Sequence, residues 1–228
     1  QYIFWVITDT WGDVPYSEAL QGPDKPNPKY DTQEEIYKGI LSNLASAVAA
    51  MDNSAISGDV IYNGNAANWK KAANSLRMLA AIQLSKKYPG ASEYAATEFK
   101  AALADANGYI ATNSENLAVT FPGLFKSSWY NLYDGRKDFA ESKTLTDLTA
   151  SLSDARQNAF GGASADPGTT ESSNIGVPYG VKRETAELFT GANPKWAKVL
   201  RGDLRTDKGT VTIISAAEVA LARAEAAD

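Results

Sequence analysis

The sequence has 228 residues and a formal net charge of −5, and it contains neither histidine nor cysteine. These two absences exclude Ser-His-Asp triads, Cys-His pairs, disulfides, zinc ribbons and iron–sulfur clusters. The lysines and arginines are scattered rather than gathered in a stripe, so the sequence predicts no nucleic-acid partner, and we expect no cofactor and no resident metal.

A proline-rich loop over residues 12–30 precedes the first strong helical pattern, which covers residues 32–52. Thr32 and Glu35 have the spacing of a capping box, in which each side chain accepts a hydrogen bond from the backbone N–H of the other residue. Apolar residues then recur every three or four positions, namely Ile36, Ile40, Leu44, Val48 and Met51. This spacing predicts an amphipathic helix with one buried face.

Two further helices are predicted over residues 67–87 and 92–110. Their apolar faces are rich in alanine, and Pro89-Gly90 marks a short turn between them. Small side chains let helix axes approach closely, as they do in the stacked helix pairs of repeat proteins. Because no fixed repeat period is present, a tetratricopeptide-like array would be a degenerate one.

The middle of the chain has weaker patterns. One short helix is predicted over residues 144–153 from its leucine spacing. A long loop is predicted over residues 161–180, with a short hairpin near residues 176–181. Long loops are uncommon in compact domains unless they carry function. The helical pattern returns over residues 215–227.

Oxygen-bearing side chains gather near glycine at residues 52–54 and 59–65. The pattern lacks both the glycine at the sixth position and the closing glutamate of an EF-hand loop. It is therefore typical of polar turns between helices rather than of a calcium site.

Paired carboxylates could hydrolyse a glycosidic bond, and the candidates are Asp134, Asp138, Glu141 and Asp154. In a chain with 27 acidic residues, such a cluster arises by chance. Solvated surface charge is the favoured interpretation, with a carboxylate-based glycoside hydrolase kept as an alternative.

The stretch 127–136 mixes aromatic and planar polar side chains in a predicted loop. Aromatic faces stack on the apolar faces of sugar rings, and amide, carboxylate and guanidinium groups bind sugar hydroxyls. The predicted stacking residues are Trp129, Tyr130 and Tyr133, and the predicted hydrogen-bonding residues are Asn131, Asp134 and Arg136. Two alternatives stay open: the aromatic residues could pin the loop to the core, or the site could lie on the 161–180 loop or in terminal parts that we expect to be missing from this sequence.

Stretches along nearly the whole chain resemble, in order, motifs of the SusD/RagB family of surface nutrient-binding lipoproteins. They are TWGDVPYSEA at 10–19, DTQEEIY at 31–37, DVIYNGN at 59–65, WKKAANSLR at 69–77, RKDFAESK at 136–143, SDAR at 153–156, SAAEV at 215–219 and AEA at 224–226. Each motif is short, but the ordered set is specific. Ala155 departs from the family, which often has proline before the arginine at position 156.

The resemblance implies an all-α fold, a tetratricopeptide-like helical superhelix with a long loop-rich ligand-binding segment. It implies one SusD-like domain over residues 1–228, which we expect to be incomplete at both termini. In this fold Trp69 would pack a helix hairpin, and Arg77, Asp154 and Arg156 would be buried or half-buried ion-pair residues. The family motifs mark none of these four residues as a ligand contact.

The resemblance also implies a function without catalysis. A member of this family binds a glycan, or in some cases a peptide, and delivers it to a SusC-like TonB-dependent transporter. It would sit on the outer face of a Bacteroidetes outer membrane through a lipid anchor that is absent from this sequence. A helical-repeat scaffold for a protein partner remains the other alternative.

Overall fold

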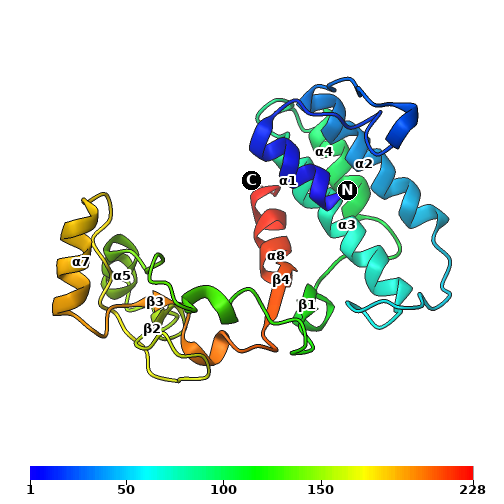
Figure 1. The fold of residues 1–228 in the computed structure, drawn as a ribbon. Coiled ribbons are helices and arrows are strands. Elements are labelled where there is room, and N and C mark those ends of the chain that lie inside the picture. The colour runs from blue at the N-terminus through cyan, green and yellow to red at the C-terminus, as the bar shows by residue number, and fades with distance from the viewer. Residues whose placement is uncertain (228) are drawn as a thin grey trace. The chain divides into compact units, whose positions relative to one another are not determined.

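The computed structural model describes residues 1–227, which fold into two compact units. Unit 1 contains residues 1–119 and the chain from residue 212 onward, and unit 2 contains residues 120–211. The chain leaves unit 1 along strand β1 (Leu117–Thr120) and returns along strand β4 (Thr210–Ile214), which pair with each other (Figure 1). The single domain expected from the sequence stays a prediction.

Unit 1 is a bundle of antiparallel and crossing helices (Figure 1). They are α1 (Tyr2–Trp11), α2 (Gln33–Ala50), α3 (Ala66–Gln83), α4 (Tyr94–Leu103) and α8 (Ala216–Glu225), with short 3₁₀ turns η1 (Gly22–Asp24) and η2 (Asn113–Glu115). Helix α3 lies at the centre, because it packs against α2, α4 and α8, while α1 packs against α2. None of the helices in residues 1–227 combines the length and the apolar character that a membrane crossing requires.

The predicted ends of α2 are close to those observed. The backbone N–H of Glu35 donates to Thr32 Oγ1, and the N–H of Thr32 donates to Glu35 Oε2 over 2.8 Å, so the capping box is present. The periodic apolar residues of α2 form one wall of the core, with Ile36, Ile40 and Leu41 fully buried. Buried alanines of α3 and α4 belong to the same core, in which α3 packs closely against both α2 and α4.

The helix predicted over residues 92–110 is too long. Helix α4 ends at Leu103, because the Asp105 carboxylate accepts hydrogen bonds from Asn107 and because Gly108 adopts a left-handed φ of 74°. The turn sends Ile110 into the core, where its N–H donates to Ser75 Oγ over 2.8 Å. Apolar periodicity here reflected a buried loop residue rather than a continuing helix.

Unit 2 is made mostly of loops held around short elements. These are η3 (Tyr130–Tyr133), α5 (Lys143–Ser151), α6 (Gln157–Phe160), β2 (Gly161–Gly162), α7 (Arg183–Ala192), β3 (Lys198–Val199) and η4 (Gly202–Leu204). Strands β2 and β3 pair antiparallel, with Gly161 opposite Val199. The buried apolar cluster of this unit consists of Tyr133, Val177 and Trp196.

Two sequence-based predictions for unit 2 differ from the structure. Helix α5 forms where predicted, but the hairpin near 176–181 does not, because Val177 instead bridges Ser142 in parallel through bonds to Glu141 and Lys143. Helix α7 was not predicted at all. It buries no residue, its Leu188 is 78% exposed, and only Ala186 and Phe189 pack against the core of unit 2, so its apolar face is too short to predict a helix from sequence.

Candidate functional site

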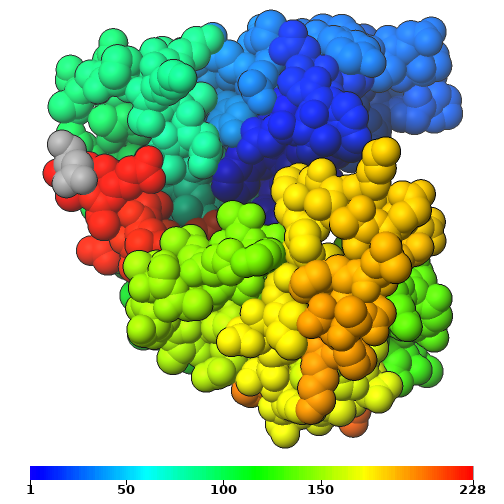
Figure 2. Space-filling model, turned by 90° about the vertical axis from the view of Figure 1, so that its left-hand side faces the viewer, coloured from blue at the N-terminus to red at the C-terminus, as the bar shows by residue number. Residues whose placement is uncertain are grey.

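A hollow of about 840 Å³ opens on unit 2. One wall comes from the segment between Tyr133 and Ala140, another from α7, and Ala165, Val177 and Trp196 complete the lining. Helix α7, coloured between yellow and orange in the space-filling view, lies at the surface of unit 2 (Figure 2). Aromatic, small apolar and charged side chains thus meet in one depression.

The aromatic part of the hollow is held rigidly. The hydroxyl of Tyr133 donates to the carbonyl of Phe139 over 3.1 Å and accepts from the N–H of Val199 over 2.6 Å. The Tyr133 and Trp196 rings meet edge to face, with centroids 6.2 Å apart. Burial raises the pKa of Tyr133, so the phenol stays neutral and keeps both hydrogen bonds.

The rim of the hollow carries two exposed ion pairs. Arg136 Nε donates to Asp138 Oδ2 over 2.7 Å, and Arg183 Nε donates to Glu187 Oε1 over 2.7 Å. Each pair fixes a planar guanidinium beside a carboxylate, which leaves further donors and acceptors for the hydroxyls of a ligand. Lys137 also lines the hollow, and in residues 1–227 it has no ion-pair partner.

Two buried cations lie against the aromatic rings of the hollow. The ammonium of Lys198 is 4.1 Å from the Trp196 ring centroid and donates to the carbonyls of Ala163 and Pro194. The guanidinium of Arg205 is 4.7 Å from the Tyr133 ring centroid. Its donors are bound by three carbonyls, those of Ser164, Ala165 and Leu200.

A buried carboxylate braces the loops beside this site. Glu141 is 5% exposed, and Gln157 Nε2 donates to its Oε2 over 2.7 Å, whereas its Oε1 has no hydrogen-bond partner among residues 1–227. Burial raises the pKa of Glu141. Gly161 is required next to it, because a Cβ there would come within 2.0 Å of the Ser173 carbonyl and 2.6 Å of the Glu141 carboxylate.

The structure separates the six residues predicted to bind a ligand. Tyr133 and Arg136 line the hollow, but the ring of Tyr133 is 8% exposed and so serves mainly as core. Trp129 and Tyr130 are half-buried, and Lys126 lies 4.5 Å from the Tyr130 ring centroid. Asn131 and Asp134 are exposed. These four residues do not line the hollow, and their binding role stays a prediction.

Other residues singled out from the sequence have structural partners. The carboxylate of Asp59 accepts hydrogen bonds from four donors, which hold the polar turn in place. The donors are the backbone N–H groups of Ile61, Tyr62 and Gly64 and the Nε1 of Trp69. Arg77 is buried beside Glu98, at 3.6 Å. Asp154 and Arg156 pair as predicted, but the Arg156 side chain is exposed because it turns back over its own loop.

No group of three or more acidic side chains in residues 1–227 lies close enough together to hold a metal ion. At Asp59 the carboxylate accepts hydrogen bonds from backbone N–H groups, as is typical of a polar turn. Although burial raises the pKa of Asp59, these hydrogen bonds outweigh it and hold the pKa below its usual value.

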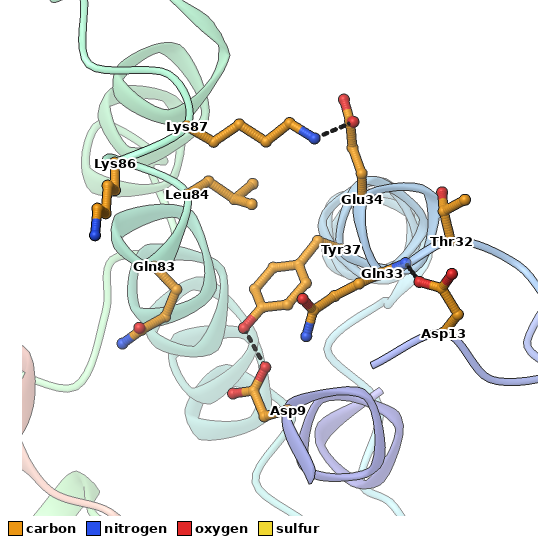
Figure 3. Close-up of a pocket in the computed structure, with 10 residues that line it drawn as sticks. All are labelled: Asp9, Asp13, Thr32, Gln33, Glu34, Tyr37, Gln83, Leu84, Lys86 and Lys87. Carbon is orange, nitrogen blue, oxygen red and sulfur yellow. Dashed lines mark hydrogen bonds and ion pairs between the residues drawn. The ribbon is translucent and has the colours of Figure 1, made fainter. Parts of the chain in front are cut away.

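A second hollow, of about 810 Å³, lies in unit 1 between α1, the start of α2 and the end of α3 (Figure 3). Tyr37 and Asp9 point toward each other across it, and the Tyr37 hydroxyl donates to Asp9 over 2.5 Å. Gln33 donates to Asp13, and Glu34 binds Lys87. As in the hollow of unit 2, the polar groups here bind one another and the aromatic ring is buried. The hollow of unit 2 differs in the small side chains of Ala140, Ala165 and Ala186 that line it and leave room for a sugar ring.

Sequence reasoning missed most of the unit 2 hollow. Trp196, Lys198 and the α7 residues lie in stretches without periodicity, far along the chain from Tyr133. One signal in the sequence pointed to this region. Trp196 stands beside alanine and lysine in a stretch without periodicity, and tryptophan is highly buried on average. Which distant segment buries it cannot be read from the pattern.

The chain is similar to a known protein family and to several solved structures. The family model SusD-like_2, described as "Starch-binding associating with outer membrane", matches residues 1–228. No curated protein matches the chain at a significant level.

Several solved structures share the fold. A protein described as a "chitin-binding protein" is 27% identical with a TM-score of 0.77, covering 99% of this chain and 49% of that one. A SusD homologue from Bacteroides fragilis NCTC 9343 is 25% identical with a TM-score of 0.76, covering 98% and 50%. A chitin-binding SusD homologue from Flavobacterium johnsoniae is 22% identical with a TM-score of 0.76, covering 96% and 44%, and shows the fold alone. The chain therefore spans about half the length of the solved structures that it matches, and the predicted helical fold class is confirmed.

Proposed function

The chain belongs to the SusD-like family, as its motifs predict, and on that premise we propose that its protein binds an extracellular glycan in the hollow of unit 2 and acts without catalysis. The observation that carries the proposal is this hollow, in which Tyr133 and Trp196 meet a rim of arginines and carboxylates. Its volume of about 840 Å³ lies within the range of about 300–1,000 Å³ that is common for ligand sites.

The composition of the hollow suits a sugar. Small residues such as Ala140 and Ala186 leave room for a ring, the edges of the aromatic side chains provide apolar surface, and Arg136 and Thr190 can bind hydroxyls. The printed description of one similar structure as chitin-binding supports a glycan ligand, and a peptide remains the second ligand class that the family resemblance allows.

Calorimetry on matched arginine variants tests the site. Arg136 and Arg156 are both exposed, both lie in unit 2, and each pairs with an aspartate two residues away. We expect Arg136→Ala to weaken the binding of the cognate glycan by roughly tenfold, because a charge-assisted hydrogen bond contributes about 1.5–3 kcal/mol. Arg156→Ala should bind like the wild type. Equal affinities for all three proteins would contradict the hollow as the site.

Trp129 and Tyr130 are proposed to extend the binding surface beyond the hollow, because they are half-buried and each keeps part of its ring accessible. Trp129→Ala and Tyr130→Ala, each checked for folding first, test this extension. Unchanged affinity for the glycan in both variants would restrict the site to the hollow and leave residues 129–131 with an architectural role.

Binding without catalysis is supported by the carboxylates of the hollow. A glycosidase needs a carboxyl group whose pKa burial has raised, so that it can donate a proton. Asp138 and Glu187, which line the hollow, are exposed and paired with arginines, and the buried Glu141 does not line it. Release of reducing sugar from a polysaccharide panel by the pure protein would contradict this part of the proposal.

The proposed partner is a SusC-like TonB-dependent transporter, with the whole protein anchored by lipid to the cell surface. The family description, which names association with the outer membrane, supports the location. Purification of the full-length protein from native membranes tests the partner. We expect a large β-barrel protein to copurify, and its absence under mild detergent would favour the scaffold interpretation instead.

A further inference from the structure

The hollow of unit 2 is surrounded by positive charge, although the chain as a whole carries −5. On its rim, the ion pairs Arg136–Asp138 and Arg183–Glu187 neutralise themselves. Lys137 is left over on the same rim, exposed and with no carboxylate in ion-pair range within residues 1–227. The rim by itself therefore has one surplus cation.

The walls behind the rim add two more cations. Lys198 is 5% exposed and Arg205 is completely buried, and each lies against an aromatic ring that lines the hollow. Their donors are bound by backbone carbonyls, which orient the cations without cancelling their charge. Asp166, which acts on Arg205, is exposed to water. Even with Asp166 and the buried Glu141 counted, one positive charge remains in surplus around the hollow.

Buried charges project a strong field into a neighbouring depression, since little water lies between them and the ligand. The cations already repel one another. Burial lowers the pKa of Lys198 to about 8, and repulsion from Lys137 and from Arg205 acts in the same direction. An anion placed in the hollow would relieve this repulsion, whereas a neutral sugar would leave it in place.

Resting on the proposed function, we propose that the hollow of unit 2 selects glycans that carry carboxylate or sulfate groups over neutral glycans. Lys137 meets the anionic group directly from the rim, while Lys198 and Arg205 act through the field behind Trp196 and Tyr133. The three cations thereby supply specificity to a site whose shape and hydroxyl contacts any glycan could use.

Matched oligosaccharide pairs test the preference by calorimetry on the whole chain. Tetragalacturonate is compared with its methyl ester for the carboxylate arm, and a carrageenan tetrasaccharide with its desulfated form for the sulfate arm. We expect the charged member of at least one pair to bind roughly tenfold or more tightly, because little water screens the cations of the hollow from an anionic group bound there. High salt should shrink the difference, because it screens the field.

Two variants test whether the preference for the charged member arises in the hollow. Lys137→Gln should weaken binding of the charged member severalfold and that of the neutral member less, so the ratio of the two affinities should fall. Lys208→Gln is the control, because Lys208 is an exposed lysine of the same unit that does not line the hollow. Equal loss in both variants would overturn a role for this particular lysine and with it the proposal.

The outcomes separate this inference from the proposed function. If neutral members, or starch and chitin oligosaccharides, bind as tightly as the charged ones, the anionic preference is overturned and glycan binding stands. If no member of any pair and no glycan of a broad panel binds, both the proposed function and the anionic preference are overturned. Which arm shows the difference identifies the carboxylate or the sulfate as the preferred group.

Discussion

Unit 1 buries aliphatic side chains between helices, whereas unit 2 buries an aromatic pair and charged side chains among loops. Two of the three buried charged side chains of unit 1 have ionic partners, since Asp31 binds Lys29 and Arg77 lies beside Glu98, whereas Lys70 donates to the amide oxygen of Asn53. In unit 2, Glu141, Lys198 and Arg205 are equally buried, and none has an ion pair within residues 1–227.

Unpaired buried charge costs stability, so its presence in a small unit needs a reason. Unit 1 has the features of a scaffold, with a large apolar core and capped helices. Unit 2 tolerates costly groups around its hollow, as binding regions do when their groups must act on a ligand rather than on the fold. The comparison thus supports the proposal that unit 1 supplies stability and unit 2 recognition.

The largest expected effect is on unit 1. Trp69 packs against its core, meets Tyr62 edge to face at 5.3 Å, and donates from Nε1 to Asp59 over 2.9 Å. Trp69→Ala should therefore lower the free energy of unfolding by about 3–5 kcal/mol. Trp11→Ala is the matched control, since Trp11 is 70% exposed. Urea unfolding followed by circular dichroism measures both, and similar midpoints would place Trp69 outside the core.

The second effect is on unit 2. Arg205→Lys keeps the positive charge but cannot reach three carbonyls at once, so at least one buried acceptor loses its donor. We expect a loss of about 2 kcal/mol in unit 2, within the 1–3 kcal/mol cost of an unsatisfied buried group. Peptide-resolved hydrogen exchange should show faster exchange in residues 120–211 and unchanged exchange in α2 and α3. Arg156→Lys, at an exposed position, should change neither region.

The third effect is a pH dependence of unit 1. The ion pair with Lys71, and the N–H donors of Ala111 and Thr112, lower the pKa of Glu115 to about 2. Because the unfolded pKa is about 4.3, the stabilisation is complete above that pH and is lost between about pH 4.3 and 2. Glu115→Gln should cost roughly 2 kcal/mol at neutral pH and little near pH 2. A difference that does not change with pH would contradict this account.

Replacement of Glu141 by glutamine in unit 2 should change the pH dependence of stability in the opposite direction. Burial raises the pKa of Glu141, so the folded unit binds this proton more readily than the unfolded chain does. Ionised Glu141 therefore costs stability at neutral pH, and the cost disappears as the pH falls through the raised pKa. In Glu141→Gln this gain on acidification should be absent. Hydrogen exchange of the peptide containing Gly161, measured from neutral to mildly acidic pH, compares the two proteins.

Local sequence signals predicted four of the five helices of unit 1, missing α1, whereas they predicted unit 2 poorly, for a physical reason. The capping box of Thr32 and the stripe of α2 act within one helix, so their spacing is visible in the chain. The aromatic pair of unit 2 joins positions 133 and 196, and no periodicity relates two loop residues so far apart. Buried charge is also hidden, because Lys198 and Arg205 look like any surface cation until the loops around them are known.

The smallest expected effect on stability is at Arg183, and it is the most informative about the division of labour. Arg183 pairs with Glu187 one turn along α7, both side chains are exposed, and α7 buries no residue. Exposed pairs of this kind contribute only about 0.3–0.5 kcal/mol, so Arg183→Gln should leave the unfolding midpoint almost unchanged. Yet the change removes a cation from the rim of the hollow and frees the carboxylate of Glu187, so an anionic oligosaccharide should bind more weakly at low salt. A variant with wild-type stability and weaker binding would separate recognition from folding within unit 2, and a loss of stability without any loss of binding would show instead that α7 holds the unit together.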